Sequence, residues 1–396
     1  MLTRTNQKNG DELSILGFGC MRFPKNGREI DEQRAIAMIH EAIEKGVNYF
    51  DTAYVYNNGK SESILGAALA GGWREKVKIA TKLPPFMVKT LANAKKIMDT
   101  QLSRLQTNSI DYYLLHMLTD KPMYDRLASL GVMEWLEEQK NKGVIKNIGF
   151  SFHGGKKDFE LILKAYPWDF CQIQYNYMDE NNQATKDGLI LAANMGIPVI
   201  VMEPLRGGKL VTHLPESVIK EFSSQKPERS SAEWGLRWVW NHPQVNVVLS
   251  GMSDENQLAD NIRIASDATP NSLTEEELKV FEQVKAVMLE KTKIPCTGCG
   301  YCMPCPFGVD IPSCFSCYND KYLMNDKSAR FKYFQVAGAL SHNPAVASQC
   351  HECGKCESHC PQKIEIRKQL KTIVREFEGP LYRPAAAIVR KIMRVK

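Results

Sequence analysis

Two runs of cysteines near the C-terminal end of the chain have the spacing of metal-cluster ligands. The first reads C-x2-C-x2-C-x2-C-P and the second reads C-x2-C-x2-C-x3-C-P. Their cysteines are Cys296, Cys299, Cys302 and Cys305, then Cys350, Cys353, Cys356 and Cys360. The second spacing is typical of bacterial proteins with two [4Fe–4S] clusters, in which the cysteine before the proline binds the other cluster. The pattern therefore predicts two [4Fe–4S] clusters.

The same rule divides the ligands between the clusters. One predicted set is Cys296, Cys299, Cys302 and Cys360, and the other is Cys350, Cys353, Cys356 and Cys305. Zinc is the alternative metal, because two C-x2-C pairs can form a closed four-thiolate site, but the prolines and the three-cysteine rhythm favour iron. The first run is one residue shorter than the second, so Cys314 and Cys317 could replace its fourth ligand. Otherwise these two are buried residues or a redox-sensitive pair.

A second group of reactive side chains lies in the first 120 residues, after short apolar runs. Its members are Asp51, Tyr56, Lys82 and His116. A tyrosine has a pKa near 10, and a nearby lysine ammonium lowers that value because it favours the phenolate. A carboxylate would hold the ammonium, and a histidine beside the phenol would position a carbonyl oxygen. Together they would form a general acid for hydride transfer to an aldehyde or ketone.

Eight short β-branched runs alternate with longer helical patterns over the first 265 residues. The predicted strands are Ile15–Gly19, Val47–Phe50, Val77–Thr81, Ile110–His116, Ile145–Ser151, Phe170–Gln174, Pro198–Met202 and Val245–Ser250. Predicted helices such as Asp31–Lys45 and Val88–Leu105 give crossovers long enough for parallel strands. The pattern predicts an α/β fold, a (β/α)8 TIM barrel with reactive residues at the carboxyl ends of its strands. A doubly wound sheet is the alternative, but Gly17–Gly19 is a weak dinucleotide-binding signal without a third glycine.

The composition is that of a globular protein. The chain has 396 residues, of which 43% are hydrophobic and 24% charged, with a formal net charge of +6. No apolar run approaches the roughly 18 residues of a membrane span, and the N-terminus lacks the apolar stretch of a signal peptide. The charge is too small to indicate a nucleic-acid partner. The cysteine spacing is unlike that of a disulfide framework and predicts a cytoplasmic location.

We expect three regions along the chain. They are a barrel over residues 1–292, a mainly helical iron–sulfur domain over residues 293–366 and a basic helical tail over residues 367–396. The amphipathic stretch Leu273–Lys291 would cap the barrel and lead to the cysteines. The last part of the tail, RPAAAIVRKIMRVK (Arg383–Lys396), would be a helix packed on its own protein, although it could also lie on an acidic partner or a membrane surface.

Several stretches resemble the aldo/keto reductase family. They are NYFDTAYVYNNGKSESILGAAL (Asn48–Leu69), VKIATK (Val77–Lys82), IDYYLLH (Ile110–His116), IKNIGFS (Ile145–Ser151), CQIQYN (Cys171–Asn176) and VVLSGMSDENQLADNI (Val247–Ile262). The resemblance covers about residues 10–270. It implies a (β/α)8 barrel with Asp51, Tyr56, Lys82 and His116 as the catalytic tetrad and Tyr56 as the proton donor. It also implies a small carbonyl substrate and an NAD(P)H cofactor that extends across the barrel mouth.

Cofactor contacts follow from the same resemblance. Ser151 and Gln172 would hold the carboxamide. The remaining implied contacts are Gly19, Cys20 and Met21 at the nicotinamide end, Met202 at the ring, Pro204, Leu205 and Gly207 at the pyrophosphate, and Gly251, Ser253, Gln257 and Asn261 at the adenosine.

Three positions depart from the family pattern. Met202 stands where many members stack a tyrosine on the nicotinamide, and Phe152 replaces an asparagine. Members that prefer NADPH often carry lysine and arginine where this chain has Gly251 and Gln257, and two carboxylates, at Asp254 and Glu255, stand close by. This charge pattern favours NADH, because it opposes a 2′-phosphate. Three cations could compensate: Arg206, Lys209 and Arg263.

The sequence CTGCGYCMPCPFGVDIP (Cys296–Pro312) after such a barrel resembles the 4Fe-4S-containing branch of the family. Hydride transfer needs no iron, so the clusters predict electron exchange with an external ferredoxin or flavoprotein. Two alternatives stay open. The clusters could be purely structural, or the chain could be an electron-transfer module whose barrel only binds nicotinamide or docks a partner.

Overall fold

The computed structural model describes the whole chain except residues 28, 155, 182, 213, 297–299, 324–328, 335–343 and 393–396. The chain divides into two compact units. The first comprises Met1–Gly207 and Ala232–Thr274, and the second comprises Gly208–Ser231 and Glu275–Lys396.

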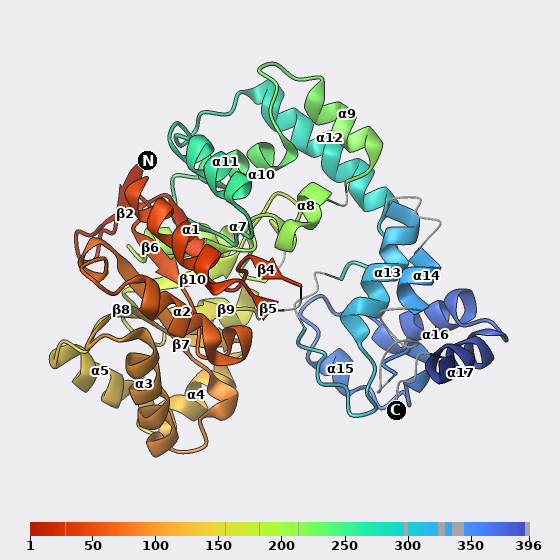
Figure 1. The fold of residues 1–396 in the computed structure, drawn as a ribbon, viewed down its shortest axis with the longest axis horizontal. Helices are drawn as coiled ribbons and strands as arrows, with labels where there is room; N and C mark the ends of the chain where they lie inside the picture. The colour runs from red at the N-terminus through yellow and green to blue at the C-terminus, as the bar shows by residue number, and fades with distance from the viewer. Residues whose placement is uncertain are drawn as a thin grey trace. The chain divides into compact units, whose positions relative to one another are not determined.

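The first unit is built on a closed barrel of eight parallel strands (Figure 1). Around the barrel the order is β10-β11-β12-β3-β6-β7-β8-β9. The strands are β3 (Leu16–Gly19), β6 (Tyr49–Asp51), β7 (Lys78–Leu83), β8 (Ile110–Leu118), β9 (Ile145–Phe152), β10 (Phe170–Gln174), β11 (Val199–Met202) and β12 (Val245–Ser250). All eight predicted strands are present, each within two residues of its predicted bounds. The predicted (β/α)8 barrel is confirmed.

Helices surround the strands, as a barrel with an apolar outer face requires (Figure 1). They are α1 (Glu32–Glu44), α2 (Lys60–Ala68), α3 (Leu91–Leu105), α4 (Lys121–Ser129), α5 (Val132–Asn141), α6 (Lys156–Leu163), α7 (Thr185–Asn194), α10 (Ser231–Trp240) and α11 (Glu255–Ala265). Local sequence sets their starts. The side chain of Asp31 accepts a hydrogen bond from the backbone of Arg34 at the start of α1, and Thr90 caps α3 in the same way.

Aromatic side chains fill the barrel interior. The ring of Tyr112 packs edge-on against Tyr49 and Phe170, with ring centroids 5.2 Å and 4.9 Å away. These three side chains are completely buried, and aliphatic residues such as Ile200 and Val247 complete the cluster. The interior is therefore a packed core, and chemistry is left to the residues at the barrel ends.

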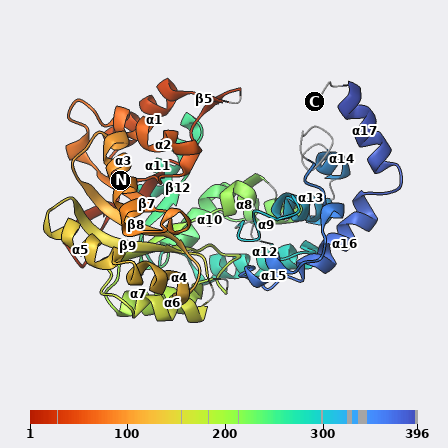
Figure 2. The ribbon, with the colours of Figure 1, turned by 90° about the horizontal axis from the view of Figure 1, so that it is seen from below.

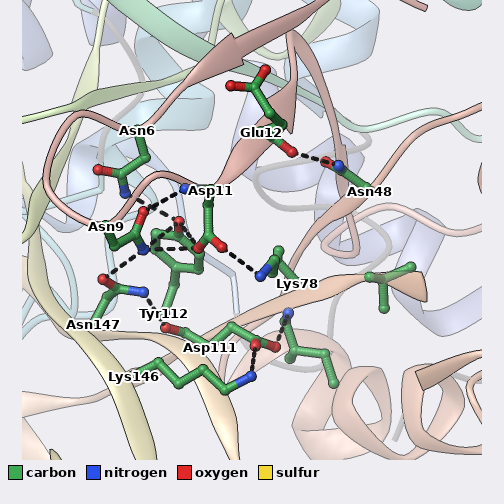
Figure 3. Close-up of polar contacts among 12 residues, drawn as sticks. Asn6, Asn9, Asp11, Glu12, Asn48, Lys78, Asp111, Tyr112, Lys146 and Asn147 are labelled. Carbon is green, nitrogen blue, oxygen red and sulfur yellow. Dashed lines mark hydrogen bonds and ion pairs between the residues drawn. The ribbon is translucent and has the colours of Figure 1, made fainter. Parts of the chain in front are cut away.

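A hairpin of β1 (Thr3–Thr5) and β2 (Glu12–Ser14) covers the amino-terminal end of the barrel. Figure 3 shows its loop reaching the hydroxyl of Tyr112, which donates to Oδ2 of Asp11 over 2.7 Å. Lys78 donates to the other oxygen of Asp11 over 2.5 Å, and Asn6 donates to the tyrosine hydroxyl over 3.1 Å. These bonds satisfy the hydroxyl of Tyr112 and the carboxylate of Asp11, so the hairpin has a structural role.

The second unit is mainly helical, as predicted. Its helices are α8 (Lys209–Thr212), α9 (Glu216–Ser223), α12 (Glu275–Lys291), α13 (Ile311–Leu323), α14 (Ala329–Phe334), α15 (Lys355–Ser358), α16 (Ile366–Phe377) and α17 (Tyr382–Ile392). Helix α12 packs against α9, where Phe281 and Phe222 meet at 5.8 Å, so the structure groups this predicted barrel cap with the second unit. The predicted boundary at residue 292 stays a prediction.

The first tail helix belongs to the core of the second unit. On α16, Leu370, Ile373 and Phe377 are buried, and they share one apolar cluster with Phe315 and Tyr318 of α13. Figure 2 shows α13, α14 and α16 close together. This packing makes α16 a helix of the second unit's own core. The two alternatives for Arg383–Lys396 stay predictions. Within the described residues, no helix is both long and apolar enough to cross a membrane.

Candidate functional site

Three neighbouring strands carry the four predicted catalytic residues. Asp51 is the last residue of β6, Lys82 lies near the end of β7, and His116 lies near the end of β8. Tyr56 begins a short 3-10 turn, η1 (Tyr56–Gly59), directly after β6. Because β6, β7 and β8 are paired in parallel, their carboxyl ends lie at one end of the barrel. The sequence therefore brings all four side chains to one rim.

The ammonium group of Lys82 is the centre of this group. Its Nζ donates to Oδ1 of Asp51 over 2.6 Å and to the backbone oxygen of Thr52 over 2.7 Å. It also lies 3.4 Å from the hydroxyl oxygen of Tyr56. Lys82 is completely buried, and Asp51 is 3% exposed. A buried cation with three such partners is fixed in position, so it applies a constant field to the phenol.

The imidazole of His116 lies beside the phenol. The rings of Tyr56 and His116 meet edge-on, with centroids 5.8 Å apart and planes at 75°. Among the described residues, Nδ1 of His116 and Oδ2 of Asp51 are buried with no hydrogen-bond partner. Buried polar atoms without partners are uncommon, and at a barrel mouth they are free to meet a ligand.

Burial governs the proton affinities of the group. Burial raises the pKa of Tyr56 above its ordinary value of 10, and the ammonium of Lys82 offsets only part of the rise. Lys82 lowers the pKa of the phenol, as expected, but desolvation outweighs the cation and the net shift is upward. Tyr56 is protonated at neutral pH and can act as an acid.

The neighbouring groups keep complementary charges. Burial opposes the charged form of Lys82, but Asp51 and the phenol raise its pKa above 10.5. Burial and the charge of Lys82 lower the pKa of His116 well below 6.5. The imidazole is therefore neutral at neutral pH, and one of its two nitrogens carries a proton that it can donate to a carbonyl oxygen.

An ion pair between Arg104 of α3 and Glu62 of α2 positions the loop that carries Tyr56. Arg104 donates to the backbone oxygen of Tyr54 over 3.1 Å and to Oε2 of the buried Glu62 over 3.1 Å. Its guanidinium also lies over the ring of Tyr54. Gly59 ends the turn with φ of +88°, and a Cβ there would stand 2.8 Å from the Arg104 guanidinium. The turn thus depends on a glycine for both its backbone and its packing.

The predicted carboxamide contacts lie on the next strands around the ring. Ser151 is on β9, where its Oγ accepts a hydrogen bond from the backbone of Met117 over 2.8 Å. Gln172 is on β10, and its Nε2 lies 3.5 Å from the sulfur of Met202 on β11. The Oε1 atom of Gln172 is buried and has no partner among the described residues. It is thus open to a donor such as an amide.

The other predicted cofactor contacts follow β11, β12 and β3, which are neighbours in the barrel. Their places are as follows: Gly19 ends β3, Cys20 is buried and Met21 is exposed; Pro204, Leu205 and Gly207 follow β11; Gly251 and Ser253 follow β12; and Gln257 and Asn261 lie on α11. These three strands are consecutive in the barrel, between β10, which carries Gln172, and β6, which carries Asp51. Their roles as cofactor contacts stay predictions.

The start of α11 is occupied by carboxylates. Asp254 caps the helix by accepting from the backbone of Gln257 over 2.9 Å, and the amide of Gln257 donates back to it over 2.6 Å. Glu255 forms a two-bond ion pair with Arg34, at 3.0 Å and 2.8 Å. The hydrogen bond from Arg34 lowers the pKa of Glu255 to about 2, so this carboxylate stays ionised.

Two of the three cations that could compensate for the missing lysine and arginine form ion pairs with carboxylates. Arg206 donates from its Nε to Oδ2 of the buried Asp179 over 2.7 Å and pairs with Oδ1 through Nη2. Arg263 pairs with Glu233 and Asp260. The third, Lys209, belongs to the second unit.

Sequence reasoning missed several polar residues at this end of the barrel. Asp179 also accepts from Asn176, over 2.9 Å, so a buried network follows β10. His153 follows β9 and is 8% exposed, and burial and the charge of Lys82 both lower its pKa. Arg22 follows β3 and donates to the carbonyl of Gly207 over 2.7 Å. Only position after a strand end could have indicated His153 and Arg22, because neither falls in a matched stretch.

The cysteines of the second unit line two cavities. The first is lined by Cys296, Cys302 and Cys360, and Cys299, the fourth predicted ligand, lies outside the described residues. The second cavity is lined by the other predicted set, which is Cys305, Cys350, Cys353 and Cys356. In the described part of the chain, no three ligand-type side chains converge as they would around a single ion. The grouping supports the predicted ligand sets, which stay predictions.

The further pair of cysteines is placed differently. Cys314 and Cys317 lie on α13 in the apolar cluster of the second unit. Burial raises the pKa of Cys314 well above 9. Neither residue is among those that line the two cavities in the described structure. This placement favours a packing role over a ligand role.

Comparisons with known proteins agree with this architecture. Residues 15–285 match the model of the aldo/keto reductase family, and residues 295–365 match that of the 4Fe-4S dicluster domain. The uncharacterized oxidoreductase YqkF of Bacillus subtilis (strain 168) is 28% identical over 301 residues, which cover 68% of this chain and 92% of the relative.

Solved structures give the same result. The aldo-keto reductase AKR11C1 from Bacillus halodurans, in its holo form, is 29% identical with a TM-score of 0.60, over 72% of this chain and 96% of that one. An aldo-keto reductase from Klebsiella pneumoniae in complex with NADPH covers the same shares with a TM-score of 0.60, but at 21% identity it supports the fold alone. The chain belongs to the aldo/keto reductase family of oxidoreductases, and a 4Fe-4S dicluster domain follows its barrel.

Proposed function

We propose that the chain reduces an aldehyde or ketone to an alcohol with NADH, with Tyr56 as the proton donor. The observation that carries the proposal is the buried contact of Lys82 with both Asp51 and Tyr56, beside His116. The open atoms of Gln172 and His116 at the same end support a nicotinamide and a carbonyl as its ligands.

Each side chain has a distinct role in this proposal. The nicotinamide, when bound, supplies the hydride to the carbonyl carbon. Tyr56 gives its proton to the carbonyl oxygen, and the ammonium of Lys82 stabilises the phenolate that remains. Asp51 holds that ammonium in place, and the neutral His116 donates a hydrogen bond that orients the carbonyl oxygen.

The charges at the start of α11 support NADH over NADPH. Glu255 is ionised, Asp254 caps the helix, and Arg206 and Arg263 already have carboxylate partners. A 2′-phosphate at this place would meet two carboxylates, and Arg206 and Arg263 could reach it only by leaving their carboxylate partners. Like charges at close range disfavour such a ligand.

The two cysteine cavities fit iron–sulfur clusters. The proposed sets are Cys296, Cys299, Cys302 and Cys360 for one cluster and Cys305, Cys350, Cys353 and Cys356 for the other. Clusters held there would supply one-electron storage, which hydride transfer alone does not need. Cys353 is exposed, so the second site lies at the surface of its unit. We infer that this cluster exchanges electrons with a ferredoxin or flavoprotein in the cytoplasm, where thiolates stay reduced.

A deuterium-transfer experiment tests the proposal. NADH labelled with deuterium at the transferable C4 position is incubated with the purified chain and a panel of aldehydes and ketones. We expect the alcohol product to carry one deuterium on its carbinol carbon. Nucleotide binding without any alcohol product across the panel would contradict the enzymatic assignment and favour the electron-transfer module.

A further inference from the structure

A buried side-chain amide lies at the first of the two cysteine cavities. Gln362 lines this cavity together with Cys296, Cys302 and Cys360. The residue is half-buried, but its Nε2 atom is fully buried and has no hydrogen-bond partner within the described part of the chain. A buried N–H group without a partner is costly, so such a donor indicates that a ligand of the cavity completes its bonding.

The surroundings of this amide are apolar. Apart from Gln362 and the cysteines, the described lining of the cavity consists of glycine, proline and large apolar residues, among them Ile311, Phe315 and Ile366. These three side chains are almost completely buried. In such surroundings the dipole of an amide acts on a nearby negative charge with little screening by solvent.

A short turn fixes Gln362 next to one of the proposed ligands. The backbone N–H of Lys363 donates to the backbone oxygen of Cys360 over 3.0 Å, so Pro361 and Gln362 are the two central residues of the turn. The ring of Pro361 restricts the backbone on one side of Gln362. On the other side, Ile364 is buried in the apolar cluster of the second unit. The backbone of Gln362 is thus held on both sides, which positions its amide at the cavity.

The polar residues at the second cavity differ from this amide. The described lining there includes His351 and Arg367 but no side-chain amide. Both are exposed: His351 stacks on Phe307 with ring centroids 4.2 Å apart, and Arg367 pairs with Glu357 over 2.7 Å. A buried amide donor therefore distinguishes the first cavity from the second in the described structure.

We propose that Nε2 of Gln362 donates a hydrogen bond to a sulfur atom of the cluster in the first cavity and raises the reduction potential of this cluster alone. The proposal rests on the iron–sulfur assignment proposed above. Reduction adds negative charge to the sulfur atoms of such a cluster, and hydrogen bonds to these atoms are one of the factors that set its potential. A donor stabilises the reduced form more than the oxidised form, because bonds to the more negative acceptor are stronger.

Redox titration of the anaerobic full chain tests this inference by a readout independent of turnover. Both clusters are followed by electron paramagnetic resonance, and the signal that Cys302→Ala removes identifies the first cavity. We expect Gln362→Met and Gln362→Leu, which lack the N–H group, to disfavour reduction of this cluster about tenfold, which lowers its potential by about 59 mV. The other cluster should keep its potential. Gln369→Met removes an amide from α16 that lines neither cavity in the described structure, and it should titrate like the parent.

A second readout uses the parent itself and decides the matter even if both variants fail to assemble the first cluster. The chain is produced with the heavy nitrogen isotope in the side-chain amides of its glutamines. The pulsed resonance spectrum of the reduced first cluster should then show a coupling to this nitrogen, and Gln369→Met should retain it. A parent without this coupling, an unchanged first-cluster potential in both Gln362 variants, or an equal shift of both clusters would overturn the inference and leave the proposed function intact. A parent chain that holds no iron would overturn both.

Discussion

The Nζ atom of Lys82 lies 3.4 Å from the hydroxyl oxygen of Tyr56, at the carboxyl ends of β6 and β7. The same ammonium donates a hydrogen bond to Asp51 over 2.6 Å. The phenol is thus next to a fixed cation while burial keeps its proton in place. Such a phenol releases its proton only when a stronger base forms beside it, which is the condition at a developing alkoxide.

The buried Lys82–Asp51 pair should be revealed by a stability cycle. Lys82→Met leaves Asp51 as a buried carboxylate without its cation, and we expect it to destabilise the barrel by about 3–5 kcal/mol. The double variant Asp51→Asn/Lys82→Met should recover most of this loss and remain inactive. Urea unfolding followed by tryptophan fluorescence measures the difference. A double variant as unstable as Lys82→Met would mean that the pair does not act as a unit.

Acid should destabilise the barrel because it protonates the buried His153. Burial lowers the pKa of His153 from 6.5 to about 4, so the unfolded chain binds a proton that the native chain does not. Its contribution is complete above pH 6.5 and is lost as the pH falls toward 4, by about 3 kcal/mol in total. His153→Gln should flatten the stability profile in this window, measured by urea unfolding between pH 4 and pH 7. An unchanged slope would contradict the assigned pKa.

Cysteine variants should distinguish the two clusters, because the two cavities separate their proposed ligands into two groups. The anaerobic parent should carry about eight irons per chain, and Cys302→Ala, Cys360→Ala and Cys305→Ala about four each. The paramagnetic spectra of Cys302→Ala and Cys360→Ala should match each other, since these residues line one cavity, and differ from that of Cys305→Ala. Cys314→Ala should retain both clusters. Two zinc ions per chain in place of iron would refute the assignment.

The nucleotide preference should depend on the first turn of α11. The parent should bind NADH more tightly than NADPH. Glu255→Gln removes one carboxylate and releases Arg34 from its ion pair, so the preference should shift toward NADPH by about fivefold. Glu138→Gln, which removes an exposed carboxylate paired with Lys142 on α5, should leave the ratio unchanged. Calorimetric titration with both nucleotides measures it, and an equal shift in both variants would indicate a general charge effect.

The strands and the catalytic group could be predicted because their signals are local. Runs such as Pro198–Met202 are apolar throughout, and parallel strands place their ends together whatever the details of packing. Side-chain partners distant in sequence could not be predicted in this way. Arg206 seemed available for a phosphate, but Asp179 holds it across 27 residues. The pKa of Tyr56 depends on burial, which its neighbours in the sequence do not reveal.

The assignment of helices to units shows the same limit. The stretch Leu273–Lys291 has an amphipathic pattern, and the structure forms α12 there. The pattern predicts an apolar face but not the surface that covers it. In the structure that surface includes Phe222 of α9, a helix from the long segment after β11. Only the folded chain brings these two segments together.

The most direct test of the account is single-turnover reduction of a carbonyl compound by Tyr56→Phe. This variant removes one hydroxyl and retains the ring beside Lys82 and His116. NADH affinity, iron content and unfolding should match the parent, whereas the rate of alcohol formation should fall by about two orders of magnitude or more. A variant that forms alcohol as fast as the parent would show that Tyr56 is not the proton donor and would contradict the proposed mechanism.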